Sequence, residues 1–263
     1  MTRIFGQAAE TWRLAARTIW ARPLPFLIAA ALLTGTDLLA WKMGALDGVP
    51  APDLDKALLA TFLFGKLAVT LGWVVAGLRL LDGRTSGLLK LGRRQLLWLG
   101  GFFLLLPVLL LFRVLIQRVM GTALAPAGAD PRTILLLSVA VYLAIFLYVQ
   151  VRLIPALVGV LLDNGEAGLA WAWRGTRGQA LFFIGGLVLA AIPLFLLHFG
   201  NSLVWLPKAS AARLAVLALD GATMAALLLV SCAAYLGLYR RALPMAEVAG
   251  SRHDPDIGAQ PSA

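Results

Sequence analysis

Residues 180–198 of the chain read ALFFIGGLVLAAIPLFLLH. This run contains no Asp, Glu, Lys or Arg, and as a helix rising 1.5 Å per residue it nearly spans the roughly 30 Å hydrocarbon core of a bilayer. Other apolar runs of comparable length lie at 24–41, 57–79, 96–116, 133–152 and 214–238. The sequence therefore predicts an all-α, polytopic membrane protein with six transmembrane helices.

The composition of the whole chain supports a membrane protein. Of its 263 residues, 60% are hydrophobic and only 14% are charged, whereas a soluble domain carries roughly 25% charged residues. The net charge of +10 is interpreted as setting topology and contacting anionic membrane lipids, and nucleic acid is not expected as a partner. The single cysteine, Cys232, excludes an intramolecular disulfide.

The distribution of basic residues predicts the orientation of the helices. Fifteen of the 23 Lys and Arg fall in segments 1–23, 79–95, 152–179 and 240–263. The positive-inside rule places these segments, and hence both termini, in the cytoplasm of a bacterium, with the helices in its inner membrane. We expect residues 1–245 to form a single six-helix membrane domain and residues 246–263 to be a polar, disordered cytoplasmic tail.

The cytoplasmic segments also contain amphipathic patterns. In residues 3–19 the apolar side chains fall on one side of a helical wheel and the charged ones on the other, which predicts an interfacial helix. The apolar set is Phe5, Ala8, Trp12, Ala15, Ala16 and Ile19, and the charged set is Arg3, Glu10, Arg13 and Arg17. Segments 86–95 and 165–178 have shorter patterns of the same kind, which are equally typical of an ordinary basic loop.

Residues 148–183, YVQVRLIPALVGVLLDNGEAGLAWAWRGTRGQALFF, contain a recognisable motif. An Arg at the end of a span, a nearby Pro-Ala, a Gly turn, an Ala-rich helix and a Trp shortly before a Gly follow one another. The residues that match are Arg152, Pro155, Ala156, Gly165, Ala170, Trp173, Arg177 and Gly178. This stretch resembles the membrane domain attached to some bacterial glycerophosphoryl diester phosphodiesterases and related stand-alone multi-span proteins.

The match departs from the family pattern at three points. Arg152 and Pro155 are closer together than usual, Ala172 stands where a serine is expected, and Gly175 replaces a leucine. The hydrolase activity of the family fusions belongs to a separate soluble domain. The resemblance therefore implies anchoring, lipid contact or regulation of a partner.

Residues able to support catalysis are few. The only histidines, His198 and His253, fall at opposite ends of the predicted topology, so that they form no metal site with each other. The chain also contains neither a phosphate-binding glycine loop nor a dinucleotide fingerprint. We predict no catalytic residue, no metal and no cofactor, and we interpret His198 as an interfacial residue.

Three ionisable residues lie inside predicted spans, in the half of the membrane nearer the outside: Asp37, Lys66 and Asp220. A charge near the bilayer centre costs at least about 2.5 to 3.5 kcal/mol, so such residues are expected to pair. Two interpretations remain. Lys66 forms an interhelical ion pair with one or both carboxylates, which we prefer, or the three residues form a proton or solute site.

Prolines and small residues suggest where helices bend or approach one another. Pro107 and Pro193 fall within spans at corresponding positions, where they either kink the helix or break it at a midplane site. Small residues four apart predict close helix packing, at Gly72 and Ala76, Gly186 and Ala190, and Gly221 and Ala225.

The function expected from these features is that of a non-catalytic, lipid-associated scaffold or a protein partner of an envelope enzyme. The alternative is a small transporter or permease-like subunit with a site near Lys66, Asp220 and Asp37. The sequence predicts no particular oligomeric state.

Overall fold

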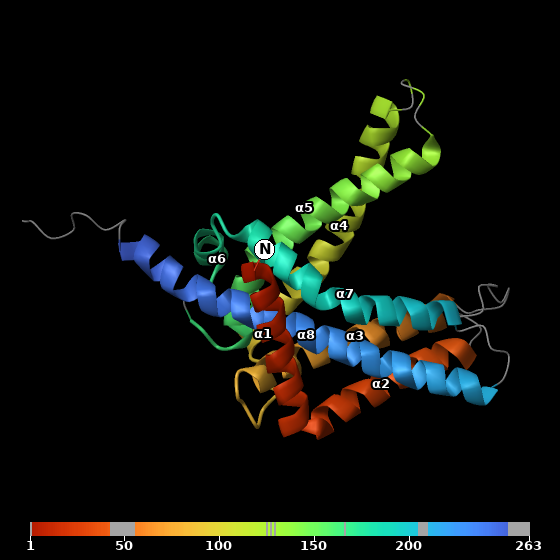
Figure 1. The fold of residues 1–263 in the computed structure, drawn as a ribbon, viewed down its shortest axis with the longest axis horizontal. Helices are drawn as coiled ribbons and strands as arrows, with labels where there is room; N and C mark the ends of the chain where they lie inside the picture. The colour runs from red at the N-terminus through yellow and green to blue at the C-terminus, as the bar shows by residue number, and fades with distance from the viewer. Residues whose placement is uncertain are drawn as a thin grey trace, which may run out of the picture. The chain divides into compact units, whose positions relative to one another are not determined.

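The computed structural model describes residues 2–42, 56–124, 126, 128, 130–165, 167–204 and 210–251. Its regular structure in these ranges is helical throughout, which confirms the predicted all-α class (Figure 1). The helices are α1 (Thr2–Ala21), α2 (Pro23–Lys42), α3 (Lys56–Leu81), α4 (Arg93–Leu124), α5 (Pro131–Leu161), α6 (Leu169–Gly175), α7 (Ala180–Val204) and α8 (Ser210–Ser251).

Each of the six predicted apolar runs lies within one of these helices. Five helices among the described residues are long and apolar enough to cross a membrane, with candidate spans at Pro23–Lys42, Phe64–Leu81, Pro131–Leu161, Ala180–Asn201 and Ala212–Pro244. The sixth predicted run lies in α4, and its crossing of the membrane stays a prediction.

The chain divides into two compact units. The first unit consists of Met1–Lys90 and Gly185–Gly237, and the second of Leu91–Ile184 and Leu238–Ala263. The predicted single domain over residues 1–245 stays a prediction. At its far end α8 continues to Ser251, beyond the predicted start of the tail at 246, and residues 252–263 lie outside the described part of the chain.

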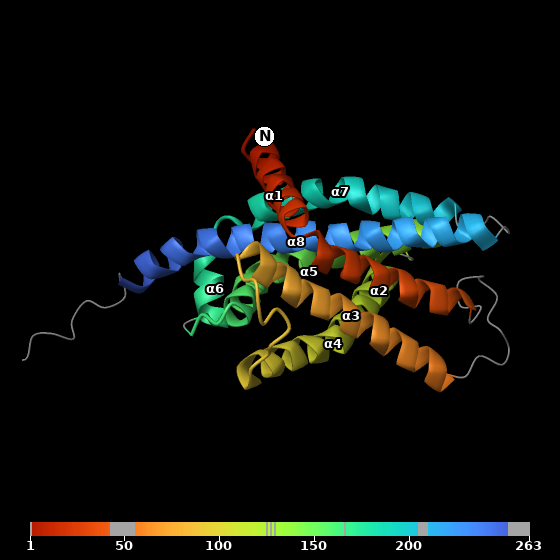
Figure 2. The same ribbon diagram turned by 90° about the horizontal axis from the view of Figure 1, so that it is seen from below.

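Close helix contacts hold the first unit together, in which α2 and α3 lie side by side (Figure 2). Gly221 of α8 packs on the backbone of α2, where an added Cβ would lie 2.8 Å from the Thr34 nitrogen. Trp73 of α3 donates its ring N–H to the carbonyl of Ala225, one turn further along α8, at 2.9 Å. Gly221 and Ala225 therefore occupy a close-approach face, as their spacing predicts.

The same use of small residues fixes α1 against α7. Gly186 lies so close to the Gln7 side chain that a Cβ there would come within 2.6 Å of it. The Trp12 ring N–H donates to the Ala190 carbonyl at 3.0 Å. The predicted helix over residues 3–19 is therefore present as α1, and one of its faces packs on protein. Its position at a membrane surface stays a prediction.

In the second unit, α4 and α5 form an antiparallel hairpin and α6 packs against α5 (Figure 1). The α6 helix lies within segment 165–178, where a short helix was an open alternative to a basic loop. Near the start of α4, the Gln95 side chain accepts the backbone N–H of Gly92 at 2.5 Å, one half of a capping box.

Residues 86–95, for which an amphipathic helix and an ordinary basic loop were both open, do not form an interfacial helix. The chain forms turns up to Gly92 and enters α4 only at Arg93, and Gly87 has a left-handed φ of +64° that interrupts a helix. The reason lies in Arg79, which is 2% exposed and donates to the carbonyls of Gly87 and Lys90 at 2.8 and 2.6 Å. Because these carbonyls accept hydrogen bonds from the guanidinium, they do not serve as acceptors in a regular helix.

Candidate functional site: a polar cluster in the first unit

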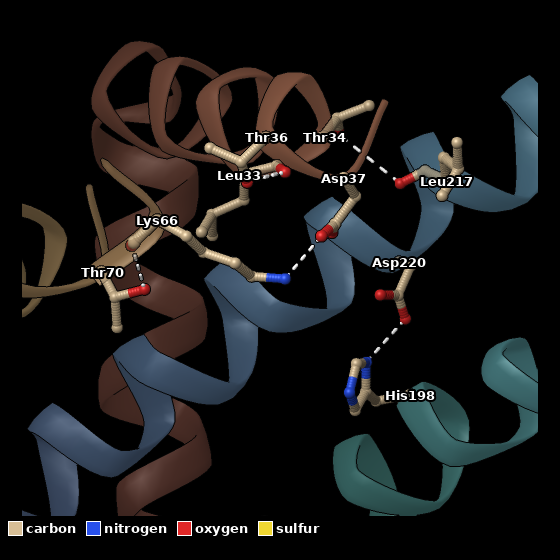
Figure 3. A network of polar contacts seen from close by, with 9 residues as sticks. All are labelled: Leu33, Thr34, Thr36, Asp37, Lys66, Thr70, His198, Leu217 and Asp220. Carbon is tan, nitrogen blue, oxygen red and sulfur yellow. Dashed lines mark hydrogen bonds and ion pairs between the residues drawn. The ribbon is translucent and has the colours of Figure 1, made fainter. Parts of the chain in front are cut away.

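Two of the three predicted intramembrane charges meet in the structure. The Lys66 ammonium on α3 lies 2.5 Å from the Asp37 carboxylate on α2 (Figure 3). The Asp37 side chain is 4% exposed and the Lys66 side chain 37%. The carboxylate is thus enclosed by protein, while the long lysine stem reaches it from a more open position.

The third predicted residue, Asp220 of α8, has different partners. Its Oδ1 lies 2.7 Å from Nδ1 of His198 and accepts a hydrogen bond from the Asn201 amide at 3.3 Å. Both partners belong to α7, and Figure 3 shows the His198 ring directed at the carboxylate. No direct bond joins Lys66 to Asp220 among the described contacts, so the structure brings Lys66 to Asp37 alone.

The interpretation of His198 as a mere interfacial residue missed this contact. A signal was present in the sequence, because His198 and Asn201 are three residues apart and therefore share a face of an otherwise apolar helix. Two polar side chains on one face of a membrane helix indicate a polar partner on a neighbouring helix.

The two pairs lie close to the same contact between α2 and α8. Asp37 follows Thr34 by three residues and Asp220 directly precedes Gly221, which packs on Thr34. The Thr34 hydroxyl also donates to the Leu217 carbonyl, at 3.5 Å (Figure 3). We call Asp37, Lys66, His198, Asn201 and Asp220 the polar cluster.

The polar cluster contains ion-pairing and hydrogen-bonding groups. Asp220 is 1% exposed, and its Oδ2 finds no hydrogen-bond partner among the described residues. Within the described part of the chain no three His, Cys, Asp or Glu side chains are grouped as metal ligands would be. The contacts that the cluster does form are one ion pair, Lys66 with Asp37, and one contact between a histidine and a carboxylate, His198 with Asp220.

The family-like motif builds a separate structure in the second unit. Arg152 of α5 is buried and donates to the Trp173 carbonyl at 2.8 Å and to the Thr176 hydroxyl at 3.0 Å. Its guanidinium also lies 4.6 Å from the Trp173 ring centre and 5.4 Å from that of Tyr148. Arg152 and Trp173 thus fasten α6 to α5, which is a structural role for these two motif residues.

The remaining motif residues lie around this contact between α5 and α6. Pro155 is buried inside α5, which continues past it. Arg177 is exposed, and Gly178 has a φ of +76° that ends the turn before α7. The departure at Gly175 has a steric reason, since a Cβ there would lie 2.8 Å from the Ala242 carbonyl oxygen.

The proline hypothesis of broken helices is not supported by the backbone. Helix α7 runs unbroken from Ala180 to Val204 with Pro193 inside it. Helix α4 is likewise continuous from Arg93 to Leu124, across position 107. These positions offer no unwound segment whose free backbone groups would hold a solute.

Comparison of the chain with protein-family models, with curated proteins and with solved structures finds no match. The resemblance of residues 148–183 to the phosphodiesterase membrane domain therefore stays a prediction.

Proposed function

We propose that this chain is a non-catalytic integral protein of the bacterial inner membrane, with six transmembrane helices and cytoplasmic termini, that serves as a lipid-associated scaffold or partner of an envelope enzyme. The observation that carries the proposal is the surface of α1. Arg3, Arg13 and Arg17 are exposed there, and so are the apolar Phe5 and Trp20. A helix at the membrane surface keeps such aromatic side chains in the interface and its arginines near anionic headgroups.

The short α6 carries the same combination in the second unit. Leu169 and Trp173 are exposed, and they are accompanied by the exposed Arg174 and Arg177. The resemblance of residues 148–183 supports the same role, since it implies a membrane domain that anchors, contacts lipid or regulates a partner.

Lipid retention tests this proposal. In native mass spectrometry of the protein released from phosphatidylglycerol-containing nanodiscs, replacing Arg3, Arg13 and Arg17 together by Gln should reduce the number of retained anionic lipids. A matched control replaces the exposed Arg113, Arg118 and Arg132 by Gln, which removes the same charge from the predicted outer side. An equal loss in both triple variants, or none with the α1 triple, would contradict lipid association through α1.

The orientation is tested separately with a reporter enzyme that is active only in the periplasm. Fusions near residues 90, 170 and 250 should give no signal, and fusions near 50, 125 and 205 should give a strong one. The reverse pattern at any two sites would overturn the six-helix topology.

One observation favours the second candidate, a small transporter or permease-like subunit. The Asp220 carboxylate is buried within the bundle and one of its oxygens lacks a partner among the described residues, and ionisable residues within membrane helices often mark ion or substrate pathways. Proton- or solute-dependent uptake into vesicles that is abolished by Lys66→Met would favour this candidate. Copurification of one soluble partner in detergent, unaffected by that substitution, would favour the scaffold.

A further inference from the structure

The charges of the polar cluster do not balance when its histidine is neutral. Asp37 and Asp220 supply two negative charges and Lys66 one positive charge. A net charge among apolar helices is costly, because neither lipid nor packed side chains replace water around it. One additional positive charge would make the cluster neutral.

Other charged groups on the packed helices lie nearer the helix ends. Lys42 is exposed at the last residue of α2. Arg213 lies over the Trp41 ring at 4.8 Å, seven residues before Asp220, or about 10 Å along α8. Among the ion pairs of the described side chains, Asp37 is paired with Lys66 from α3 and Asp220 with His198 from α7.

The geometry around Asp220 fits a proton as the missing charge. A proton on His198 makes its 2.7 Å contact with Oδ1 a charge-assisted hydrogen bond. A proton on Oδ2 instead turns the unpartnered oxygen into a donor, and Figure 3 shows this oxygen directed toward the side on which Asp37 and Lys66 lie. The neighbouring groups are nitrogen donors, whereas a hard cation such as Ca²⁺ or Mg²⁺ prefers a shell of oxygen ligands.

We propose that the polar cluster is a proton-binding site, in which His198 and Asp220 share one proton in addition to those of the Lys66 ammonium. The proton reaches the site through His198, whose side chain is 30% exposed, while Asp220 is enclosed. Asn201 holds Oδ1 in place for this exchange. The site does not depend on the lipid-associated role proposed above.

Nitrogen NMR measures the proton on the histidine directly. Because the chain has only two histidines, His253→Gln leaves His198 as the sole labelled imidazole. At a pH of about 8 a water-exposed imidazole is almost entirely neutral. In nanodiscs at this pH, the imidazolium signal of His198 and the infrared carbonyl band of a protonated carboxyl group should together account for one proton per chain.

Substitutions change that proton count in opposite directions. Asp220→Asn and Asp37→Asn each remove one negative charge and should leave His198 neutral with no protonated carboxyl group. Lys66→Met removes the fixed cation and should raise the count to two protons, and adding Asp37→Asn should return it to one. Asp82→Asn, in the loop after α3, is the control and should leave the count at one.

The proposal is overturned if the parent protein shows a neutral His198 and no protonated carboxyl group at this pH. It is also overturned if Asp37→Asn and Asp220→Asn both retain the proton. This test does not depend on Lys66→Met and can be made even if that variant fails to fold. Replacing choline by sodium as the buffer cation, at constant ionic strength, should leave the imidazolium signal and the carboxyl band unchanged. Loss of the proton signal in sodium would make a metal cation the ligand instead.

Discussion

Removing Lys66 should harm the protein more than removing its partner Asp37. The reason is the difference in burial, because the Asp37 side chain is 4% exposed and that of Lys66 37%. Lys66→Met leaves a carboxylate enclosed by protein without its cation. Asp37→Asn leaves an ammonium that is more exposed and that belongs to the same cluster as the Asp220 carboxylate.

The magnitudes follow from this asymmetry. Removing one partner of a fully buried ion pair costs about 3 to 5 kcal/mol, and the open position of Lys66 places Lys66→Met near the lower limit, at about 3 kcal/mol. Asp37→Asn should cost about 1 kcal/mol, because the lysine is already partly solvated and Asp220 still supplies one negative charge to the cluster. The double variant should be more stable than Lys66→Met alone, with a coupling energy of about 2 kcal/mol.

Reversible unfolding in mixed micelles of increasing SDS fraction measures these free energies. Thr70→Ala, one turn from Lys66 on α3, serves as the control, because its hydroxyl only donates to the Lys66 backbone carbonyl. Equal losses for Lys66→Met and Asp37→Asn would refute the argument from burial. A double variant no more stable than Lys66→Met would refute the pairing as a stabilising contact.

Three further expectations concern close packing and the loop that follows α3. Gly221→Ala should destabilise the first unit by about 1 to 3 kcal/mol because its Cβ meets the α2 backbone, whereas Gly237→Ala, with open space on the same helix, should be neutral or stabilising in the same unfolding assay. Gly175→Ala should lower the thermal stability because its Cβ would lie 2.8 Å from a carbonyl oxygen, and Gly165→Ala, which meets nothing within 4 Å, should not. Arg79→Met removes charge-assisted bonds to the loop carbonyls, so that opening of the loop should become easier by about 2 kcal/mol and its limited proteolysis roughly 30-fold faster; an unchanged cleavage rate would refute this role.

The helices themselves were predictable from the sequence because a continuous apolar run encodes them directly. Each of the six predicted runs coincides with a helix, although α5 and α8 extend well beyond the predicted ends at 152 and 238. Hydropathy locates the part of a helix that suits a bilayer, and a helix continues past it wherever its backbone remains hydrogen-bonded. This is why α8 runs on to Ser251 through a charged stretch.

The polar cluster was only half predictable. That Lys66 pairs with a carboxylate follows from its depth and charge, but the sequence left both Asp37 and Asp220 open as its partner. The partner of Asp220 could not be predicted from depth, because Lys66 lies at a suitable depth as well. Whether Asp220 contacts Lys66 or His198 depends on which helices pack against α8. That information lies in the contact of Gly221 with α2 and in the shared face of His198 and Asn201.

The choice between helix and loop at residues 86–95 was open for a related reason. Leu88 and Leu91 stand opposite basic side chains on a helical wheel, but a pattern this short is also satisfied by a loop. What decides the outcome is Arg79, which the sequence presents only as one more basic residue near the end of a span. Once buried, its guanidinium must find acceptors, and the loop carbonyls supply them.

The specificity of the helix packing therefore resides in the few small and polar residues. A leucine side chain in lipid and one against another helix both lie in apolar surroundings, so leucines contribute little to the choice of partner. Gly221, by contrast, permits the α2 and α8 backbones to approach at Thr34, three residues before Asp37, and Asp220 directly precedes this glycine. A larger residue at 221 would separate the helices and deprive the carboxylates of their shared surroundings. The position of this glycine thus determines both how the first unit packs and whether its charges form one cluster.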